Sequence, residues 1–196
     1  MDGDWRDAIS LRLVSLALRG FGRLSDDHVL GVAVRGAVLI DLGLRYPAVV
    51  SSDAFGADLR PTGFPPADRL LSQPGQTPTS LLQRSRVDQT DLAAEHVRLG
   101  SWTQRGSWLR RRYRDQLPER TRADASAMTS PADRRWQPAD AALAAVASAL
   151  GVLGTRRATP TDALLQATGT ARPLVELVVQ HIGDNIRAAT ESAGGA

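Results

Sequence analysis

The chain has 196 residues, a hydrophobic content of 42% and no cysteine, which excludes disulfide frameworks and thiolate zinc sites and predicts one globular, intracellular domain. The formal net charge is only +3, and all 24 basic residues are arginine, a bias typical of GC-rich genomes. The N-terminus MDGDWRDAIS begins with acidic residues and lacks the basic-then-apolar order of a signal peptide, so we expect a cytoplasmic protein.

Two helices are predicted near the N-terminus. The first is amphipathic, runs from Trp5 to Arg19, and is ended by glycines. The second spans Asp26 to Arg45, has Ser25 as its expected N-cap, and stops before Pro47, because the residue before proline is forced out of helical geometry.

The helix from Asp26 to Arg45 is the longest apolar run in the chain. Its apolar residues lie nearly all round the helical cylinder, which is typical of a protein core or a membrane span. The run from Val29 to Leu44 covers only roughly 24 Å, whereas a bilayer core requires roughly 30 Å. We therefore predict a buried core helix, in which Arg35 needs an anionic partner or must emerge at a surface.

The sequence pattern in the middle of the chain predicts short secondary-structure elements. A β-hairpin is expected over Pro47 to Leu59, and the proline-rich stretch from Arg60 to Pro78 is expected to be a loop with one helical turn at Ala67 to Leu71. Two helices follow, over Thr79 to Arg86 and over Asp88 to Leu99.

A second hairpin is predicted from Ser101 to Tyr113, with its turn at Gln104 to Gly106 and with tryptophan, leucine and tyrosine on its strands. Seven arginines and only two acids, Asp115 and Glu119, lie in the region that contains this hairpin, and the arginines are Arg105, Arg110, Arg111, Arg112, Arg114, Arg120 and Arg122. Such a local basic patch favours a polyanion, either nucleic acid or an anionic lipid surface.

The C-terminal part is predicted to be mostly helical. Residues 119–137 look irregular or only briefly helical, and three helices are expected after them: Ala139 to Leu153, ended by Gly154; Thr161 or Asp162 to Thr168; and Arg172 to Ala189. The expected fold is mainly α, a single-domain helical bundle over residues 1–190 around the buried central helix, with short β-hairpins and a disordered tail at 191–196.

No catalytic motif is found. The three histidines, His28, His96 and His181, have no metal-binding spacing, and the chain has no serine elbow, Walker loop or dinucleotide fingerprint. Asp26 and Asp27 are better explained as a helix start than as a catalytic pair. We therefore expect no enzymatic activity, no cofactor and no metal.

The predicted hairpin combines basic and large amphipathic side chains, a mixture that suits a membrane interface. Its candidate membrane-contacting residues are Arg105, Trp108, Leu109, Arg110, Arg111, Arg112, Tyr113 and Arg114. Each arginine near an anionic surface contributes about 1 kcal/mol, so binding is expected to be weak and reversible unless the tryptophans also insert. A solvated basic loop with its tryptophans in the core is the equally weighted alternative.

A second candidate site consists of Arg35, Arg84 and Arg86. If the fold brings these arginines together, they form a phosphate site, because guanidinium groups match phosphate oxygens bidentately. Scattered surface arginines are the simpler interpretation.

Several segments resemble the Golgi phosphoprotein 3 family in its actinobacterial form. They are LRLVSLAL at 11–18, GRL at 22–24, VRGAVLIDLGLR at 34–45, PTG at 61–63, LL at 81–82 and LAAEHVRLGSW at 92–102. The resemblance covers residues 9–113 well and continues beyond them mainly as an order of helices.

The resemblance implies a mostly helical domain whose basic face docks on membranes. Eukaryotic members bind phosphatidylinositol 4-phosphate and retain glycosyltransferases through their cytoplasmic tails. In the family's lipid pocket, Arg35 stands at the LRG arginine and Arg86 at the first of two later arginines, whereas Asp26 replaces a tryptophan and Gln89 replaces the second arginine. These replacements argue against tight selection of that lipid, although Arg84 offers a compensating charge.

We therefore predict a non-enzymatic peripheral membrane protein on the inner face of the membrane, which binds anionic lipid head groups through Arg35, Arg84, Arg86, Gln89, Asp26 and the hairpin. A role as an adaptor for the tails of membrane enzymes follows from the resemblance alone, and homo-oligomerisation stays open. The alternative is a winged-helix DNA-binding protein, but Asp88, Asp91 and Glu95 place acids on its recognition helix.

Overall fold

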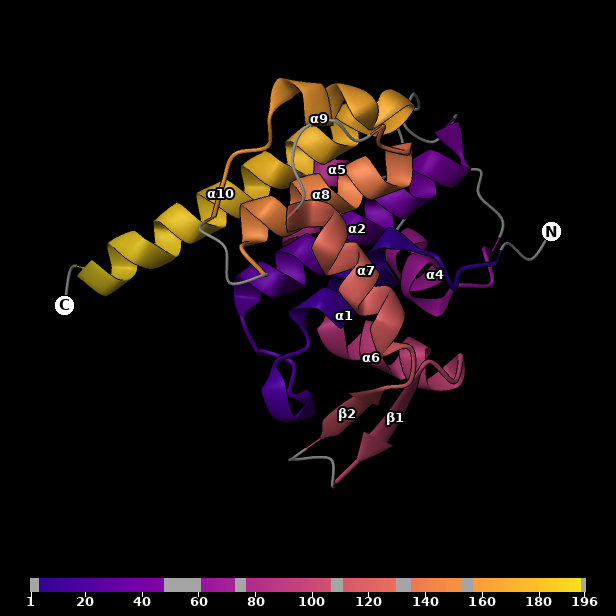
Figure 1. Ribbon diagram of the computed structural model, residues 1–196. Coiled ribbons are helices and arrows are strands. Elements are labelled where there is room, and N and C mark those ends of the chain that lie inside the picture. The colour runs from indigo at the N-terminus through magenta and orange to yellow at the C-terminus, as the bar shows by residue number, and fades with distance from the viewer. Residues whose placement is uncertain are drawn as a thin grey trace.

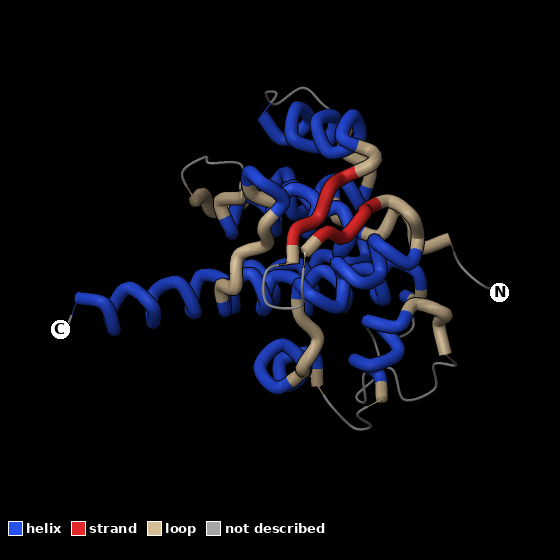
Figure 2. Tube along the Cα trace, turned by 90° about the horizontal axis from the view of Figure 1, so that it is seen from below, coloured by secondary structure: helices blue, strands red, loops and turns tan. Residues whose placement is uncertain are grey.

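The computed structural model describes residues 4–47, 61–72, 77–106, 111–129, 135–152 and 157–194. The fold is mainly α, with one two-stranded antiparallel sheet (Figures 1 and 2). Its elements are α1 (Ile9–Ala17), η1 (Gly20–Gly22), α2 (His28–Arg45), α4 (Pro65–Leu71), α5 (Pro78–Arg84), α6 (Gln89–Arg98), β1 (Trp102–Arg105), β2 (Arg112–Asp115), α7 (Pro118–Thr129), α8 (Pro138–Leu150), α9 (Asp162–Ala167), η3 (Gly169–Ala171) and α10 (Arg172–Gly194).

Helix α2 is the buried centre of the bundle, as its all-round apolar pattern predicts. It packs on α1, α8 and α10, and its residues from Val29 to Gly43 are buried. Close approach to α10 depends on Gly36, because a Cβ at this position would lie only 2.3 Å from Val178 Cγ1. The expected N-cap was wrong by two residues: the side chain of Asp27, not Ser25, accepts the backbone N–H of Val29.

Helix α1 begins later than its amphipathic pattern predicts. Trp5 lies before the helix but is buried, stacked on Phe64 with ring centroids 4.6 Å apart. The helix starts at Ile9 because the buried carboxylate of Asp41 accepts the N–H groups of Ile9 at 2.7 Å and Ser10 at 3.0 Å. A side chain from α2 therefore caps α1, and local sequence could not place that start.

The clearest error concerns α7, which occupies much of the stretch expected to be irregular. None of its residues is buried, so it lacks the apolar stripe on which helix prediction depends. Polar contacts add to the packing of the half-buried Ala125 and Met128. Asp124 binds Arg12 on α1, and the Thr121 hydroxyl donates to Asp115 at 2.6 Å. Pro118 stands at its first position, where proline is well tolerated.

Smaller corrections concern helix ends. Helix α5 stops at Arg84 rather than Arg86, because Ser85 is extended, and α8 ends at the left-handed Gly151 rather than at Gly154. Helix α10 continues to Gly194, so the tail predicted to be disordered from 191 is helical as far as that residue. The last part of α10 projects beyond the body in both views (Figures 1 and 2).

The remaining predictions divide between confirmed and untested elements. Helix α6 starts at the capping box of Asp88 and Asp91, close to its expected position, and α9 is capped by Thr161. The predicted helical turn before Leu71 is part of α4. The hairpin predicted over Pro47 to Leu59 falls almost entirely outside the described residues.

Candidate functional site

The β1–β2 hairpin extends from one end of the bundle, below α6 in Figure 1. Its register pairs Trp102 with Asp115, Thr103 with Arg114, Gln104 with Tyr113 and Arg105 with Arg112. The predicted turn at Gln104 to Gly106 was therefore wrong, because Gln104 and Arg105 belong to β1. Trp108, Leu109 and Arg110, which are predicted to contact the membrane, lie outside the described residues.

The two faces of the hairpin differ. Trp102 and Tyr113 are buried against the body, and the Trp102 ring stacks on His96 with centroids 4.1 Å apart. Tyr113, which is predicted to contact the membrane, therefore belongs to the core instead. Directly paired residues share a face, and side chains alternate along each strand, so the opposite face carries Arg105, Arg112 and Arg114. All three are exposed, as is Arg111 beside them. We call Arg105, Arg112 and Arg114 the hairpin surface.

Arg105 and Arg112 stand directly opposite each other on the hairpin surface. Like charges at paired positions destabilise a sheet, with Cβ atoms only about 5 Å apart. Within the described part of the chain, none of the three hairpin-surface arginines makes an ion pair. The hairpin surface therefore has uncompensated positive charge that an external anion would stabilise.

A tight turn packs against the hairpin on its β2 side. The turn, Arg19 to Arg23, is closed by Arg19 N–H donating to Arg23 O at 2.9 Å and by Gly22 N–H donating to Arg19 O at 3.1 Å. Gly22 has φ +72° and approaches β2 so closely that a Cβ there would lie 2.0 Å from Tyr113 O. We call these five residues the η1 turn; they are the indigo loop beside β2 in Figure 1.

Phe21 is the unusual residue of the η1 turn. Its backbone is left-handed, with φ 64° and ψ 16°, and it is 90% exposed. A bulky L residue in this region costs about 1 to 2 kcal/mol, which glycine or asparagine would largely avoid. The exposed ring also leaves apolar surface in water. Sequence reasoning missed Phe21, because GFG appeared only as the link between two helices.

An open groove of about 720 Å³ runs between the η1 turn and β2. Its basic lining residues are Arg19, Arg23 and Arg112, and Asp26 is its one acidic lining residue. The first three come from two separate segments, and none of them makes an ion pair within the ranges that the structure describes. We call this groove the η1–β2 groove.

Arg35, the predicted head-group ligand on α2, is 7% exposed. Its Nε donates to Leu82 O at 2.7 Å and its Nη1 to Val87 O at 3.3 Å. Arg35 thus makes no direct ion pair among the described residues, and backbone carbonyls accept its hydrogen bonds. Burial lowers the pKa of Arg35, an effect partly opposed by Asp88, and the group stays charged.

Gln89 connects Arg35 to the η1–β2 groove. A Cβ on Gly31 would lie 3.5 Å from Arg35 Nη1 and 3.7 Å from Gln89 Oε1, so both side chains flank this glycine. Gln89 Nε2 donates to Ser25 O at 3.1 Å, and Ser25 and Asp26 line the groove. Gln89 Oε1 is buried without a hydrogen-bond partner. The structure thus brings Arg35, Gln89 and the Asp26 segment into one neighbourhood.

Arg84 and Arg86 are placed differently. Both are exposed, and within the described ranges their side chains make no hydrogen bond or ion pair. Arg84 ends α5, which packs on α2 and α10, whereas the hairpin packs on α6 and η1. Arg86 directly precedes Val87, whose carbonyl binds Arg35. Neither arginine lines the η1–β2 groove.

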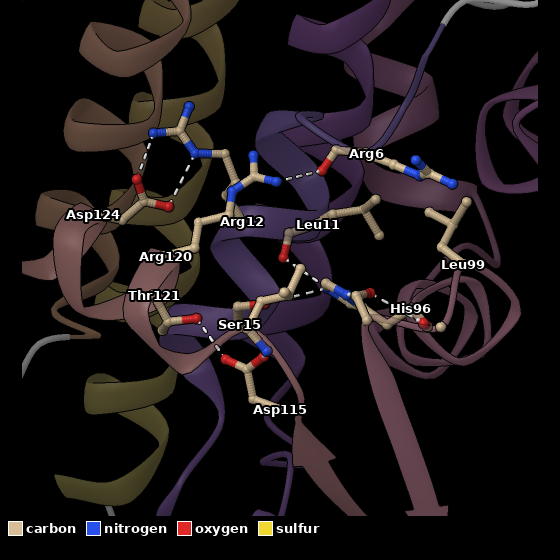
Figure 3. A pocket seen from close by; sticks show the side chains of 13 residues that line it. Arg6, Leu11, Arg12, Ser15, His96, Leu99, Asp115, Arg120, Thr121 and Asp124 are labelled. Atoms are coloured by element: carbon tan, nitrogen blue, oxygen red, sulfur yellow. Dashed lines mark hydrogen bonds and ion pairs between the residues drawn. The ribbon is translucent and has the colours of Figure 1, made fainter.

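A second cavity, of about 300 Å³, lies between α1, α6 and α7 (Figure 3). His96 is at its wall, with Nε2 2.9 Å from Leu11 O and Nδ1 2.8 Å from Ser101 Oγ. A carbonyl can only accept, so Nε2 carries the proton and Nδ1 accepts from the serine hydroxyl. Burial lowers the pKa of His96 to about 4. Both ring nitrogens of His96 are therefore engaged in hydrogen bonds within the fold.

Arg12, which also lines this cavity, joins three helices through ion pairs. Arg12 on α1 donates to Asp124 on α7 at 2.6 Å and to Asp140 on α8 at 2.7 Å. Burial lowers the pKa of Arg12, but the bonds to the two carboxylates outweigh it and raise the net pKa. We call these three residues the Arg12 cluster. Sequence reasoning missed it because Arg12 lies more than 100 positions from each of the two acids.

Searches for other kinds of site and for relatives gave negative results. Over the described ranges, no group of three or more histidine and acidic side chains could hold a metal ion. None of the described helices combines the length and apolar character needed to cross a bilayer. Comparisons with family models, curated proteins and solved structures found no match to this chain. The resemblance to the Golgi phosphoprotein 3 family therefore stays a prediction from the sequence.

Proposed function

We propose that this protein is a non-catalytic peripheral membrane protein that binds anionic lipid head groups through the hairpin surface and the adjoining region of Arg35. The observation that carries the proposal is the direct pairing of Arg105 with Arg112 on an exposed face that also carries Arg114. Lipid phosphates would neutralise this repulsion, and guanidinium groups match their oxygens well.

The charge on the hairpin surface gives the expected strength of binding. Each arginine near an anionic bilayer contributes about 1 kcal/mol, so three contribute about 3 kcal/mol, roughly a hundredfold in affinity. The attraction falls off within a Debye length of about 10 Å at moderate ionic strength. Binding should therefore be reversible and should weaken as salt is added.

The region of Arg35 adds a second feature that supports the proposal. Arg35 is a buried cation held only by carbonyls, and the neighbouring Gln89 has a buried acceptor without a partner. A lipid head group in this neighbourhood could supply both a negative charge and a hydroxyl donor. Selection of a particular head group, and an adaptor role toward membrane enzymes, are extensions of this proposal that rest on the family resemblance.

Two acids on α6 argue against DNA binding. On α6, the helix that a winged-helix protein would place in a DNA groove, Asp91 pairs with Arg69 and Glu95 pairs with Arg98. These acids are used within the fold and would face the phosphates unfavourably. DNA binding is therefore kept as an outcome of the test.

The test is sedimentation of the protein with vesicles of phosphatidylglycerol and phosphatidylcholine, with pure phosphatidylcholine as the neutral reference. We expect the variant R105Q/R112Q/R114Q to bind the anionic vesicles about a hundredfold more weakly than the wild type, with an unchanged urea midpoint. The matched control R6Q/R122Q/R187Q removes the same charge from exposed positions on other elements and should bind better than the hairpin variant. Retention on duplex DNA but on no vesicle would overturn the proposal.

A further inference from the structure

The η1 turn has three properties that the packing of the fold does not require. Phe21 is a bulky residue in a left-handed conformation, it is exposed, and it sits between arginines at both ends of the turn. Strained backbone and exposed apolar surface both disfavour this arrangement in water. An environment that takes up the ring and neutralises the arginines would favour it.

The turn is also rigidly held against the hairpin surface. Two backbone hydrogen bonds close it, and Gly22 meets the backbone of Tyr113 with no room for a side chain. The backbone that carries Phe21 is thereby held next to β2. A rigid aromatic ring loses little conformational entropy on contact, which favours its use as an anchor.

We propose that the η1 turn is a second membrane-contacting element, in which Phe21 enters the interface of an anionic bilayer while Arg19, Arg23 and Arg112 bind lipid phosphates in the η1–β2 groove. This inference rests on the proposed lipid-binding function and names a site that is distinct from Arg35 and Arg86. It assigns the apolar contact with the bilayer to Phe21.

The charges that line the η1–β2 groove favour a bilayer over a protein partner. The groove has three arginines and only Asp26 as an acid, and the hairpin surface next to it is also purely basic. A protein docking site of this size typically combines a larger apolar centre with both signs of charge at its rim. One aromatic ring surrounded by arginines is instead the pattern of interfacial anchors, in which the ring lies at the head-group level and the cations bind phosphates.

The absence of cysteine from the chain allows a direct test. Phe21→Cys provides one attachment point for an environment-sensitive fluorophore, and Leu117→Cys, at an apolar side chain that is 51% exposed and lies beside the other cavity, is the matched control. We expect the emission of the label at position 21 to shift to the blue on addition of phosphatidylglycerol vesicles. The label at position 117 should not respond.

A second variant measures affinity without a label. Phe21→Asn keeps a residue that tolerates the left-handed conformation, so the turn should stay folded, with a urea midpoint equal to or above that of the wild type. Because the phenyl ring would be buried only when it enters the bilayer interface, its loss should weaken vesicle binding about tenfold to a hundredfold. Leu117→Asn should bind like the wild type.

Each outcome separates the two proposals. If the wild type binds anionic vesicles but neither the label at position 21 nor Phe21→Asn shows an effect, the η1 turn is not inserted and this inference fails alone. If the wild type binds no vesicle, the proposed function fails and takes the inference with it. A blue shift at position 21 that grows with protein concentration in the absence of vesicles would show that a second copy of the chain covers Phe21, and would overturn the bilayer as its occupant.

Discussion

Arginine is used in two contrasting ways in this protein. Arg12 in the Arg12 cluster is half-buried and shared between Asp124 and Asp140, so it ties α1, α7 and α8 together. Arg105 and Arg112 on the hairpin surface are exposed, face each other and have no carboxylate partner among the described residues. The same side chain therefore stabilises the fold in one region and remains available to an external anion in the other. The residue type is the same in both regions, and the presence or absence of carboxylate partners distinguishes the two roles.

The contrast predicts that the two sets of arginines differ most in their effect on stability. Arg12→Met leaves two half-buried carboxylates without a counter-charge, so it should lower the free energy of unfolding by about 3 to 4 kcal/mol. R105Q/R112Q/R114Q should change it by less than about 1 kcal/mol, because these exposed arginines make no ion pair among the described residues. Urea unfolding followed by circular dichroism measures both. Equal destabilisation by the two variants would show that the Arg12 cluster and the hairpin surface contribute alike to the stability of the fold.

The pH dependence of stability should come from two buried titratable groups, Asp41 and His96, which bind the backbone of α1. Burial raises the pKa of Asp41 to about 6, although the N–H groups of Ile9 and Ser10 oppose the shift. Burial lowers the pKa of His96 to about 4. The unfolded values are about 3.9 for aspartate and about 6.5 for histidine.

The two shifts have opposite signs. Below pH 6 the folded state binds a proton at Asp41 before the unfolded state does, so the wild type should gain stability relative to Asp41→Asn as the pH falls toward 4. The unfolded state protonates histidine first, so over the same range the wild type should lose stability relative to His96→Gln. Each change is at most about 3 kcal/mol. Urea midpoints at neutral pH, pH 5 and pH 4 test this; two differences of the same sign would contradict the assigned environments.

The smallest effect tests whether the η1 turn and the hairpin surface act as one unit. Gly22→Ala adds a methyl group 2.0 Å from Tyr113 O at a positive φ, so the turn must move away from β2, with a loss of about 2 kcal/mol in stability and weaker vesicle binding. Gly20→Ala is the control, because a Cβ there meets no atom within 4 Å. Identical vesicle binding by both variants would show that the position of the turn is unimportant.

Local patterns in the sequence determined the core helix and the capped helices. The all-round apolar run predicted α2, Pro47 predicted its end, and the apolar residues along one side of Asp88 to Leu99 predicted α6. These features depend on residues within a turn or two of each other. The basic character of the hairpin could be predicted for the same reason, since it follows from composition over a short stretch.

Tertiary structure alone decided which groups meet. It placed Asp41 at the start of α1, gave Arg35 carbonyl partners, and held α7 by polar contacts without an apolar stripe. The strand register that sets Arg105 opposite Arg112, and the packing of Gly22 that presents Phe21 beside them, likewise depend on contacts between distant residues. Periodicity and caps specify an element from its own residues, whereas the partner of a charge and the exposure of a ring are fixed only when separate elements pack.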